Sequence, residues 1–120
     1  MDNEKGFSNP DPGLERSKTH IMAELAGYMT DSVVTTTIIR KSTGNIIVMS
    51  FAAGKGLPEI TSAFDKFIQV IEGRAEIVID KGIHLVNTGE GIVIPAHTLN
   101  SIKPDGQFKI MLTTIKSGYE

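Results

Sequence analysis

The sequence contains no cysteine. This absence excludes disulfides, thiolate metal ligands and cysteine nucleophiles, and it leaves the redox compartment open. The sequence also lacks an apolar run approaching the roughly 20 residues that a membrane-spanning helix needs. Its N-terminus lacks the basic, apolar and small-residue succession of a signal peptide. We therefore expect a cytoplasmic protein with no membrane partner.

An excess of basic residues is lacking as well. Twelve Lys and Arg residues stand against fourteen Asp and Glu residues, and the formal net charge is -2. No basic stripe is available to neutralise a phosphate backbone, so nucleic acid is not expected as a partner. A chain of 120 residues with 40% apolar content can form one ordinary hydrophobic core. One domain is expected.

The first 18 residues are poor in large apolar side chains. They hold only Met1, Phe7 and Leu14 among polar residues and two of the five prolines, so this arm cannot bury much surface alone. If it packs on a neighbouring surface, Phe7 and Leu14 are the expected anchors. Apolar residues at positions 21, 22, 25, 28 and 29 then predict a short helix capped by Thr19. Residues 1–31 are accordingly predicted to form an N-terminal arm with a short helix.

From residue 32 onward the composition favours strands. Residues 33–39 are largely β-branched, which suits a pleated, half-buried surface. After a turn at residues 41–45, residues 46–53 are apolar on both faces, as in an inner strand. Gly54, Gly56 and Pro58 are then expected to interrupt the sheet. Further strands are predicted at residues 67–71, 75–80, 83–86, 92–94 and 108–115.

These segments amount to seven or eight strands, separated by turn signals at the intervals of an all-β sandwich or barrel. No alternation of strands with helices is present. The pattern alone leaves an immunoglobulin-like sandwich, an up-and-down barrel and a double-sheet jelly roll open.

Residues 32–116 resemble a small single-domain cupin. The cupin pattern is G-x5-H-x-H-x3or4-E-x6-G, followed after a spacer by G-x5-P-x-G-x2-H-x3-N. Here the first half begins at Gly54 and ends at Gly73, which closes the segment Val-Ile-Glu-Gly at residues 70–73. The second half fits Gly89 followed after five residues by Pro95. Glycine allows the positive φ of barrel-corner turns, and proline ends a strand. The resemblance implies an all-β fold, a double-stranded β-helix or jelly-roll barrel over residues 32–120, with a short N-terminal helix.

The metal-ligand positions of the cupin pattern do not carry ligands in this sequence. The two histidines of the first half fall on Ile60 and Ser62, the glutamate on Lys66, and the histidine of the second half on Asn100. Isoleucine and protonated lysine offer no lone pair, and serine and asparagine are weak neutral donors. We therefore expect no metal and no cofactor.

Several residues remain as candidates for the site. Ser62, Lys66, His97 and Asn100 could bind a ligand through polar groups, and Met49 and Met111 could line an apolar pocket. Lys66 either reaches out to the barrel mouth or binds an anion, because a buried ammonium must be paired or neutral. His97 is the one candidate for a catalytic base, or it only caps a loop. His84 and His20 are expected to face solvent.

Three functions are compatible with these residues. The first is a metal-free barrel that binds or senses a small molecule. The second is a metal-independent enzyme, such as a sugar isomerase or epimerase, with His97 as base. The third is a degenerate barrel that serves dimerisation or protein interaction. We also expect a homodimer, because strand 46–53 is apolar on both faces and a small domain gains by burying more area.

Overall fold

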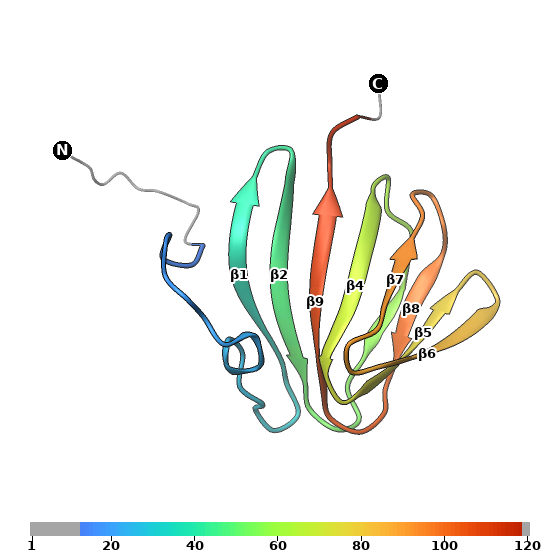
Figure 1. Cartoon of the computed structure of the whole chain (residues 1–120). Helices are drawn as coiled ribbons and strands as arrows, with labels where there is room; N and C mark the ends of the chain where they lie inside the picture. The colour runs from blue at the N-terminus through green and yellow to red at the C-terminus, as the bar shows by residue number, and fades with distance from the viewer. Residues whose placement is uncertain (1–12, 119–120) are drawn as a thin grey trace.

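The computed structural model describes residues 13–118, and the predicted anchor Phe7 lies outside them. Nine strands and one short 3-10 helix, η1, form in this part of the chain (Figure 1). In chain order they are η1 (Met22–Glu24), β1 (Val33–Lys41), β2 (Gly44–Phe51), β3 (Leu57–Ile60), β4 (Asp65–Glu72), β5 (Arg74–Ile79), β6 (Gly82–Asn87), β7 (Gly91–Ile94), β8 (Asn100–Lys103) and β9 (Phe108–Ile115).

The strands form two antiparallel sheets. One sheet has the order β1-β2-β9-β4-β7, and the other has the order β3-β8-β5-β6. Strands distant in sequence, such as β2 and β9, are neighbours, as in a double-sheet jelly roll (Figure 1). The predicted all-β fold class is confirmed. The apolar residues 46–53 were expected in an inner strand, and β2 does lie between β1 and β9.

The interior between the two sheets is most tightly filled where β2 ends and β9 begins. There Phe51 and Phe108 stack with their ring centroids 4.5 Å apart, and both are fully buried. Alternate residues of the strands continue the core away from this end, because side chains of a strand point alternately to its two faces. The core side chains are Met49, Phe51, Ile68, Val70, Ala75, Ile77, Val86, Ile94, Ile102, Phe108 and Ile110.

The opposite end of the interior is less closed. Ile47, Ile79 and Leu112 face the same interior but are only partly buried. We call this end the mouth of the barrel. It is formed by the start of β2 and β4 and by the end of β5 and β9, and it contains polar side chains described below.

The predicted helix over residues 21–29 is wrong beyond one turn. Only Met22–Glu24 are helical, Ile21 occupies the N-cap position without a side-chain hydrogen bond, and Thr19 does not cap the turn. The sheet takes the backbone carbonyls that a helix would use. Thr36 Oγ1 donates to the Leu25 carbonyl at 2.6 Å, Ser50 Oγ to the Gly27 carbonyl at 2.8 Å, and Lys109 Nζ to the Ala23 carbonyl. Residues 23–27 are thereby bound to the outer face of the five-stranded sheet.

Two further hydrogen bonds hold this N-terminal segment. Leu14, one of the two predicted anchors, is half-buried and donates its backbone N–H to the Ile38 carbonyl at 2.8 Å. Tyr28 donates its hydroxyl to Glu72 Oε2 at 2.6 Å, and Lys109 Nζ lies 4.7 Å from the centre of the Tyr28 ring. The segment therefore covers the part of the five-stranded sheet that surrounds Ser50 and Lys109.

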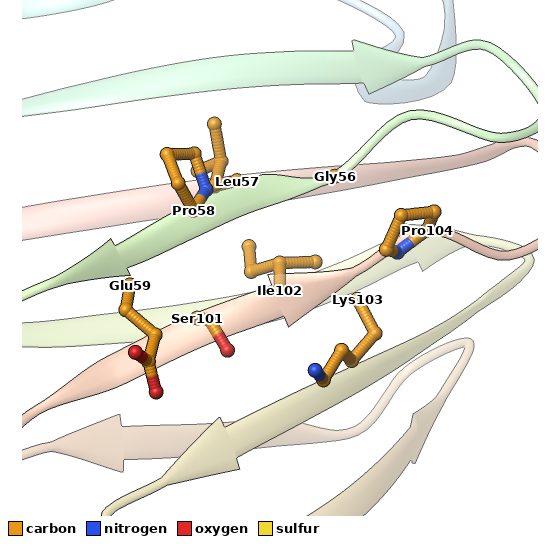
Figure 2. Close-up of a pocket in the computed structure, with 8 residues that line it drawn as sticks. All are labelled: Gly56, Leu57, Pro58, Glu59, Ser101, Ile102, Lys103 and Pro104. Carbon is orange, nitrogen blue, oxygen red and sulfur yellow. The ribbon is translucent and has the colours of Figure 1, made fainter.

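Two strands were missed by the sequence analysis. Residues 57–60 form β3 although Gly56 and Pro58 were expected to interrupt the sheet, and residues 100–103 form β8. Figure 2 shows these strands side by side. Pro58 is compatible with β3 because β3 is an edge strand. Within residues 13–118, no helix is long and apolar enough to cross a membrane.

Candidate functional site

Lys66 is the most prominent polar residue at the mouth. It stands on β4 directly between Ile94 of β7 and Thr114 of β9, and it shares the inward face of β4 with the core residue Ile68. Its side chain is half-buried, and this burial lowers its pKa from the ordinary 10.5. Within residues 13–118, the Lys66 ammonium has neither a hydrogen bond nor an ion pair.

Thr114 is a polar residue of the mouth that the sequence analysis missed. It is buried directly opposite Lys66, on the same face of β9 as Ile110 and Leu112. Its side chain therefore lies on the interior face beside the lysine. The alternation of Ile110, Leu112 and Thr114 could have identified it, because a polar residue continues an otherwise apolar inward face.

Asn100 enters the mouth from the four-stranded sheet. It is buried at the start of β8, two residues before the core residue Ile102. Its Nδ2 donates to the Ile60 carbonyl at 3.3 Å and to the Thr98 carbonyl at 3.1 Å. The amide nitrogen is thus occupied in joining β3 to the loop before β8, and Asn100 has a structural role at the edge of the site.

Ser62 and His97 lie in two loops that are joined to one another. The Ser62 carbonyl accepts the His97 N–H at 2.6 Å, and Ser62 Oγ accepts the Phe64 N–H at 3.1 Å. Asp65 Oδ1 accepts the Ala96 N–H at 2.8 Å. The two loops therefore form one rim beside Lys66 and Asn100.

His97 is exposed and has φ of 62°. This left-handed conformation is unfavourable for most residues other than glycine. In the cupin pattern the residue two positions after the proline is glycine, and here that position is His97. The backbone of the loop therefore keeps the conformation of the pattern although the residue has changed. Within the described residues the imidazole has no hydrogen bond that would orient it as a base.

The glycines that carried the resemblance adopt the backbone conformation expected of them. Gly54, Gly73 and Gly89 have φ of 85°, 84° and 86°. Strand β7 ends at Ile94, so Pro95 follows it directly, as the pattern predicts. The glycine and proline positions thus coincide with turns and with a strand end.

The two candidate methionines lie on opposite faces of the five-stranded sheet. Met49 pairs with Ile110 and belongs to the core. Met111 pairs with Val48 and Gln69, so its side chain points to the outer face of the sheet. The prediction that both line one interior pocket therefore needs correction for Met111.

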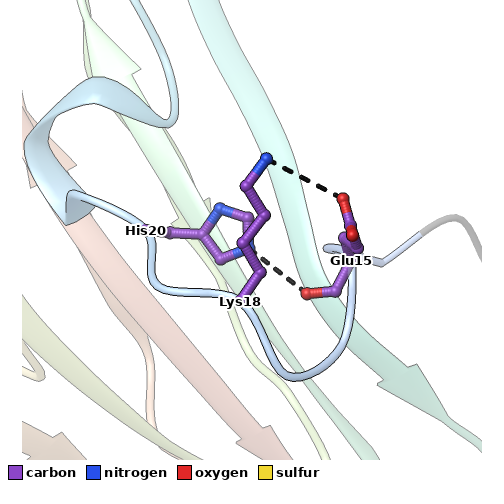
Figure 3. A network of polar contacts seen from close by, with 3 residues as sticks. All are labelled: Glu15, Lys18 and His20. Atoms are coloured by element: carbon purple, nitrogen blue, oxygen red, sulfur yellow. Dashed lines mark hydrogen bonds and ion pairs between the residues drawn. The ribbon is translucent and has the colours of Figure 1, made fainter.

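The other two histidines lie away from this group. His84 is exposed on β6, as expected. His20 is half-buried in the N-terminal segment, where its Nε2 lies 3.3 Å from the Glu15 carbonyl oxygen (Figure 3). Lys18 pairs with Glu15 at 3.8 Å in the same segment. None of these contacts involves the mouth.

The residues at the mouth do not fit the metal that cupin barrels commonly hold. Ile60, Ser62, Lys66 and Asn100 offer a hydrocarbon, a hydroxyl, an ammonium and an amide. The amide nitrogen of Asn100 is already bound to backbone carbonyls. Among residues 13–118, no three His, Cys, Asp or Glu side chains are grouped closely enough to hold a metal ion. An ammonium at the glutamate position would also repel a cation.

Comparison with known proteins identifies the fold. No family model and no curated protein sequence matches the chain. A protein of unknown function from Streptococcus pyogenes is similar in structure, with 23% identity, a TM-score of 0.83, and coverage of 97% of this chain and 99% of that one. A cupin superfamily protein from Desulfitobacterium hafniense has 21% identity and a TM-score of 0.82, covering 91% of this chain and 100% of that one.

A cupin 2 conserved barrel domain protein from Leptotrichia buccalis is also similar, at 25% identity and a TM-score of 0.75. The match covers 78% of this chain and 46% of that longer chain. These likenesses agree with the glycine and proline pattern in the sequence. The chain is a small cupin-fold domain.

Proposed function

We propose that this domain is a metal-free binding barrel that takes a small anionic ligand, a carboxylate or a phosphate, at its mouth. The observation that carries the proposal is the half-buried ammonium of Lys66, which has no partner among the described residues. A desolvated ammonium is stabilised by an anion that replaces its lost hydration. Thr114, directly opposite on β9, supplies a hydroxyl that could donate to the same anion.

The surroundings of Lys66 favour an anion with an apolar part. Ile94 and Thr114 flank Lys66 on the neighbouring strands, and partly buried Leu112 and Ile79 continue the interior surface. Binding sites of this kind combine apolar walls with a few polar groups that fix orientation. A short aliphatic or aromatic carboxylate would place its charge at Lys66 and its hydrocarbon against these side chains.

Calorimetric titration can test this proposal with three probes: benzoate, hexanoate and inorganic phosphate. Binding of a carboxylate or of phosphate to the wild type, lost in Lys66→Met and largely kept in Lys66→Arg, would support it. Lys81→Met is the matched control, because Lys81 is exposed in the turn between β5 and β6. Equal binding by wild type and Lys66→Met would contradict the proposal. The relative affinity of the probes distinguishes a carboxylate from a phosphate ligand.

An isomerase or epimerase with His97 as base receives less support from the geometry. The imidazole is exposed, and no described residue orients it. A general base needs a fixed position within hydrogen-bond reach of the proton that it removes. Turnover of a sugar substrate that disappears in His97→Ala would favour the enzyme over the binding domain.

The second candidate function is self-association through the outer face of the five-stranded sheet. Ile39, Ile46, Thr113, Phe67 and Val93 are cross-strand neighbours that form one row over β1, β2, β9, β4 and β7. We call these five residues the outer row. At about 4.8 Å between strands the outer row spans roughly 19 Å.

The outer row contains no charge, and Phe67 and Val93 are 39% and 59% exposed. An uncharged apolar strip can meet a second copy of itself about a two-fold axis without like-charge repulsion. The N-terminal segment lies beside Ile39 at the β1 end of the row, but its side-chain hydrogen bonds reach Thr36, Ser50 and Lys109 rather than Phe67 or Val93. The expected homodimer would therefore use the outer row.

A further inference from the structure

A hollow of about 280 Å³ lies beside the β3–β8 pair and is independent of the mouth (Figure 2). Its polar side chains come from Glu59 on β3 and from Ser101 and Lys103 on β8. Ser101 and Lys103 pair with Val78 and Glu76 of β5, whereas the adjacent Ile102 faces the core. Ser101 and Lys103 therefore face away from the interior that contains Lys66.

A bulge in β3 creates this hollow. Leu57 pairs with Ile102 and Ile60 pairs with Asn100, so Pro58 and Glu59 together oppose Ser101 alone. A bulge bends its strand and redirects a side chain. Just before β3, a Cβ on Gly56 would lie 2.2 Å from the Ile102 carbonyl oxygen, so the chain approaches β8 too closely for any residue other than glycine. The strand is thus held against β8 at one end and diverges from it beside Ser101.

The floor of the hollow contains an unsatisfied hydroxyl. Ser101 is only 6% exposed, and its Oγ forms no hydrogen bond to any residue of the range 13–118. Buried polar side chains in proteins nearly always have a partner. A hydroxyl that lines a hollow and lacks a protein partner indicates a ligand or a bound water as its partner.

Opposite charges flank this hydroxyl. Figure 2 shows the Glu59 carboxylate, the Ser101 hydroxyl and the Lys103 side chain on the same side of the strand pair. Neither Glu59 nor Lys103 forms an ion pair with a residue in the described part of the chain. Both charged groups are exposed and available to a ligand. Pro58 and Pro104 add apolar surface to the rim.

We propose that this hollow binds a small zwitterion of the amino-acid type. The ligand's ammonium would pair with Glu59, and its carboxylate would accept hydrogen bonds from Lys103 and Ser101. The volume lies at the lower limit of ligand pockets, which favours a molecule with few heavy atoms. A ligand with one charge would leave either Glu59 or Lys103 without a partner.

The experiment is an NMR titration of the labelled full-length protein with glycine and with 4-aminobutyrate, which differ in charge separation. Acetate and methylammonium are the single-charge controls. At least one zwitterion is expected to shift the backbone amides around residues 56–59 and 101–103 and to saturate at millimolar concentration. Each single-charge compound is expected to bind at least about tenfold more weakly. Equal shifts with acetate alone, or no shifts with either zwitterion, would overturn the proposal.

Four variants locate the contacts. Glu59→Gln and Lys103→Gln are each expected to weaken zwitterion binding about fivefold or more, whereas Lys81→Gln is the matched control and should leave it unchanged. Lys66→Met should also leave zwitterion binding unchanged. Failure of the proposed anion site at the mouth can therefore be distinguished from failure of the proposed zwitterion site in the hollow. Equal affinity in wild type, Glu59→Gln and Lys103→Gln would contradict the assignment.

Ser101→Ala separates a ligand-binding role from a structural one. Without ligand, removal of an unsatisfied buried hydroxyl is expected to raise the melting temperature by about 2–5 °C. The same variant should lose affinity for the zwitterion. A lower melting temperature together with unchanged zwitterion affinity would show that Ser101 is a structural residue and would overturn its assignment.

Discussion

Lys66 and Thr114 lie directly opposite each other on strands β4 and β9, with both side chains on the inward face of the five-stranded sheet. In the cupin pattern the Lys66 position carries a carboxylate that binds a metal. Here the same position places a positive charge at the mouth of the barrel. The exchange reverses the sign of the charge at this position, and several consequences can be measured.

Lys66→Met is expected to stabilise the unliganded protein by about 0.5–1 kcal/mol. The substitution keeps a flexible chain of similar size and removes the cost of partly desolvating an ammonium. The increase is small because the side chain is only half-buried. Urea denaturation at pH 7 measures it, and Lys81→Met at an exposed position should change stability by less than about 0.5 kcal/mol.

The difference in stability between wild type and Lys66→Met should depend on pH. Because burial lowers the pKa of Lys66 below 10.5, the unfolded state binds more protons than the folded state just below that pH. Stability due to Lys66 therefore rises as pH increases toward 10.5. The advantage of Lys66→Met over wild type should shrink over this window. A constant difference between the two proteins from pH 7 to 10.5 would argue that Lys66 is fully solvated.

Tyr28→Phe is expected to destabilise the protein by about 1 kcal/mol, since it removes the 2.6 Å hydrogen bond to Glu72 that holds the N-terminal segment. Burial and the Glu72 carboxylate raise the pKa of Tyr28 well above 10.0. The contribution of Tyr28 is therefore fully present below pH 10.0 and is lost as pH rises above it. Denaturation curves of both proteins at pH 8 and pH 11 should show a smaller difference at pH 11.

His97→Gly is expected to raise the free energy of unfolding by about 0.5–1 kcal/mol. The residue has φ of 62°, where glycine avoids the steric penalty of a side chain. His97→Val should lower it, because a β-branched residue is poorly suited to this conformation. His84→Gly is the control for the same substitution within a regular strand, β6, and it should lower the free energy of unfolding. Stabilisation by valine equal to that by glycine would refute the backbone argument.

Sedimentation equilibrium at micromolar concentration tests the outer row. The wild type is expected to have twice the mass of one 13.0 kDa chain. Val93→Asp is expected to give monomers, because it would bury a carboxylate against its own copy at a two-fold contact. Ile83→Asp is the matched control, since Ile83 is 64% exposed on the other sheet and should leave the dimer intact. A monomeric wild type, or a Val93→Asp dimer, would contradict this interface.

Much of the fold could be predicted from local sequence. The β-branched residues of β1 and the apolar residues of β2 locate these strands, and the glycine and proline spacing identifies the architecture. Strands β3 and β8 could not be located, because Pro58 and the polar residues Asn100 and Ser101 are weak strand formers. Their pairing depends on contacts distant in sequence.

The helix and the site were less predictable for the same reason. The apolar spacing of residues 21–29 favours a helix locally, but Thr36, Ser50 and Lys109 of the sheet bind the carbonyls that a helix would use. The strand β9 has apolar residues on both faces, so its sequence alone did not show that Met111 lies on the outer face. The position of Lys66 at the mouth could be predicted from the motif, because the glycines fix its place in the pattern.

The mouth of the barrel is expected to work without a metal. A divalent ion about 4 Å from the Lys66 ammonium would be opposed by roughly 8 kcal/mol at an effective dielectric near 20, and the remaining positions offer no imidazole or carboxylate to offset this repulsion. Elemental analysis of untagged protein dialysed against plain buffer is the most direct test. We expect well under one equivalent of iron, zinc, manganese, nickel or copper per chain. One equivalent of any of these metals, retained in wild type, would contradict the account.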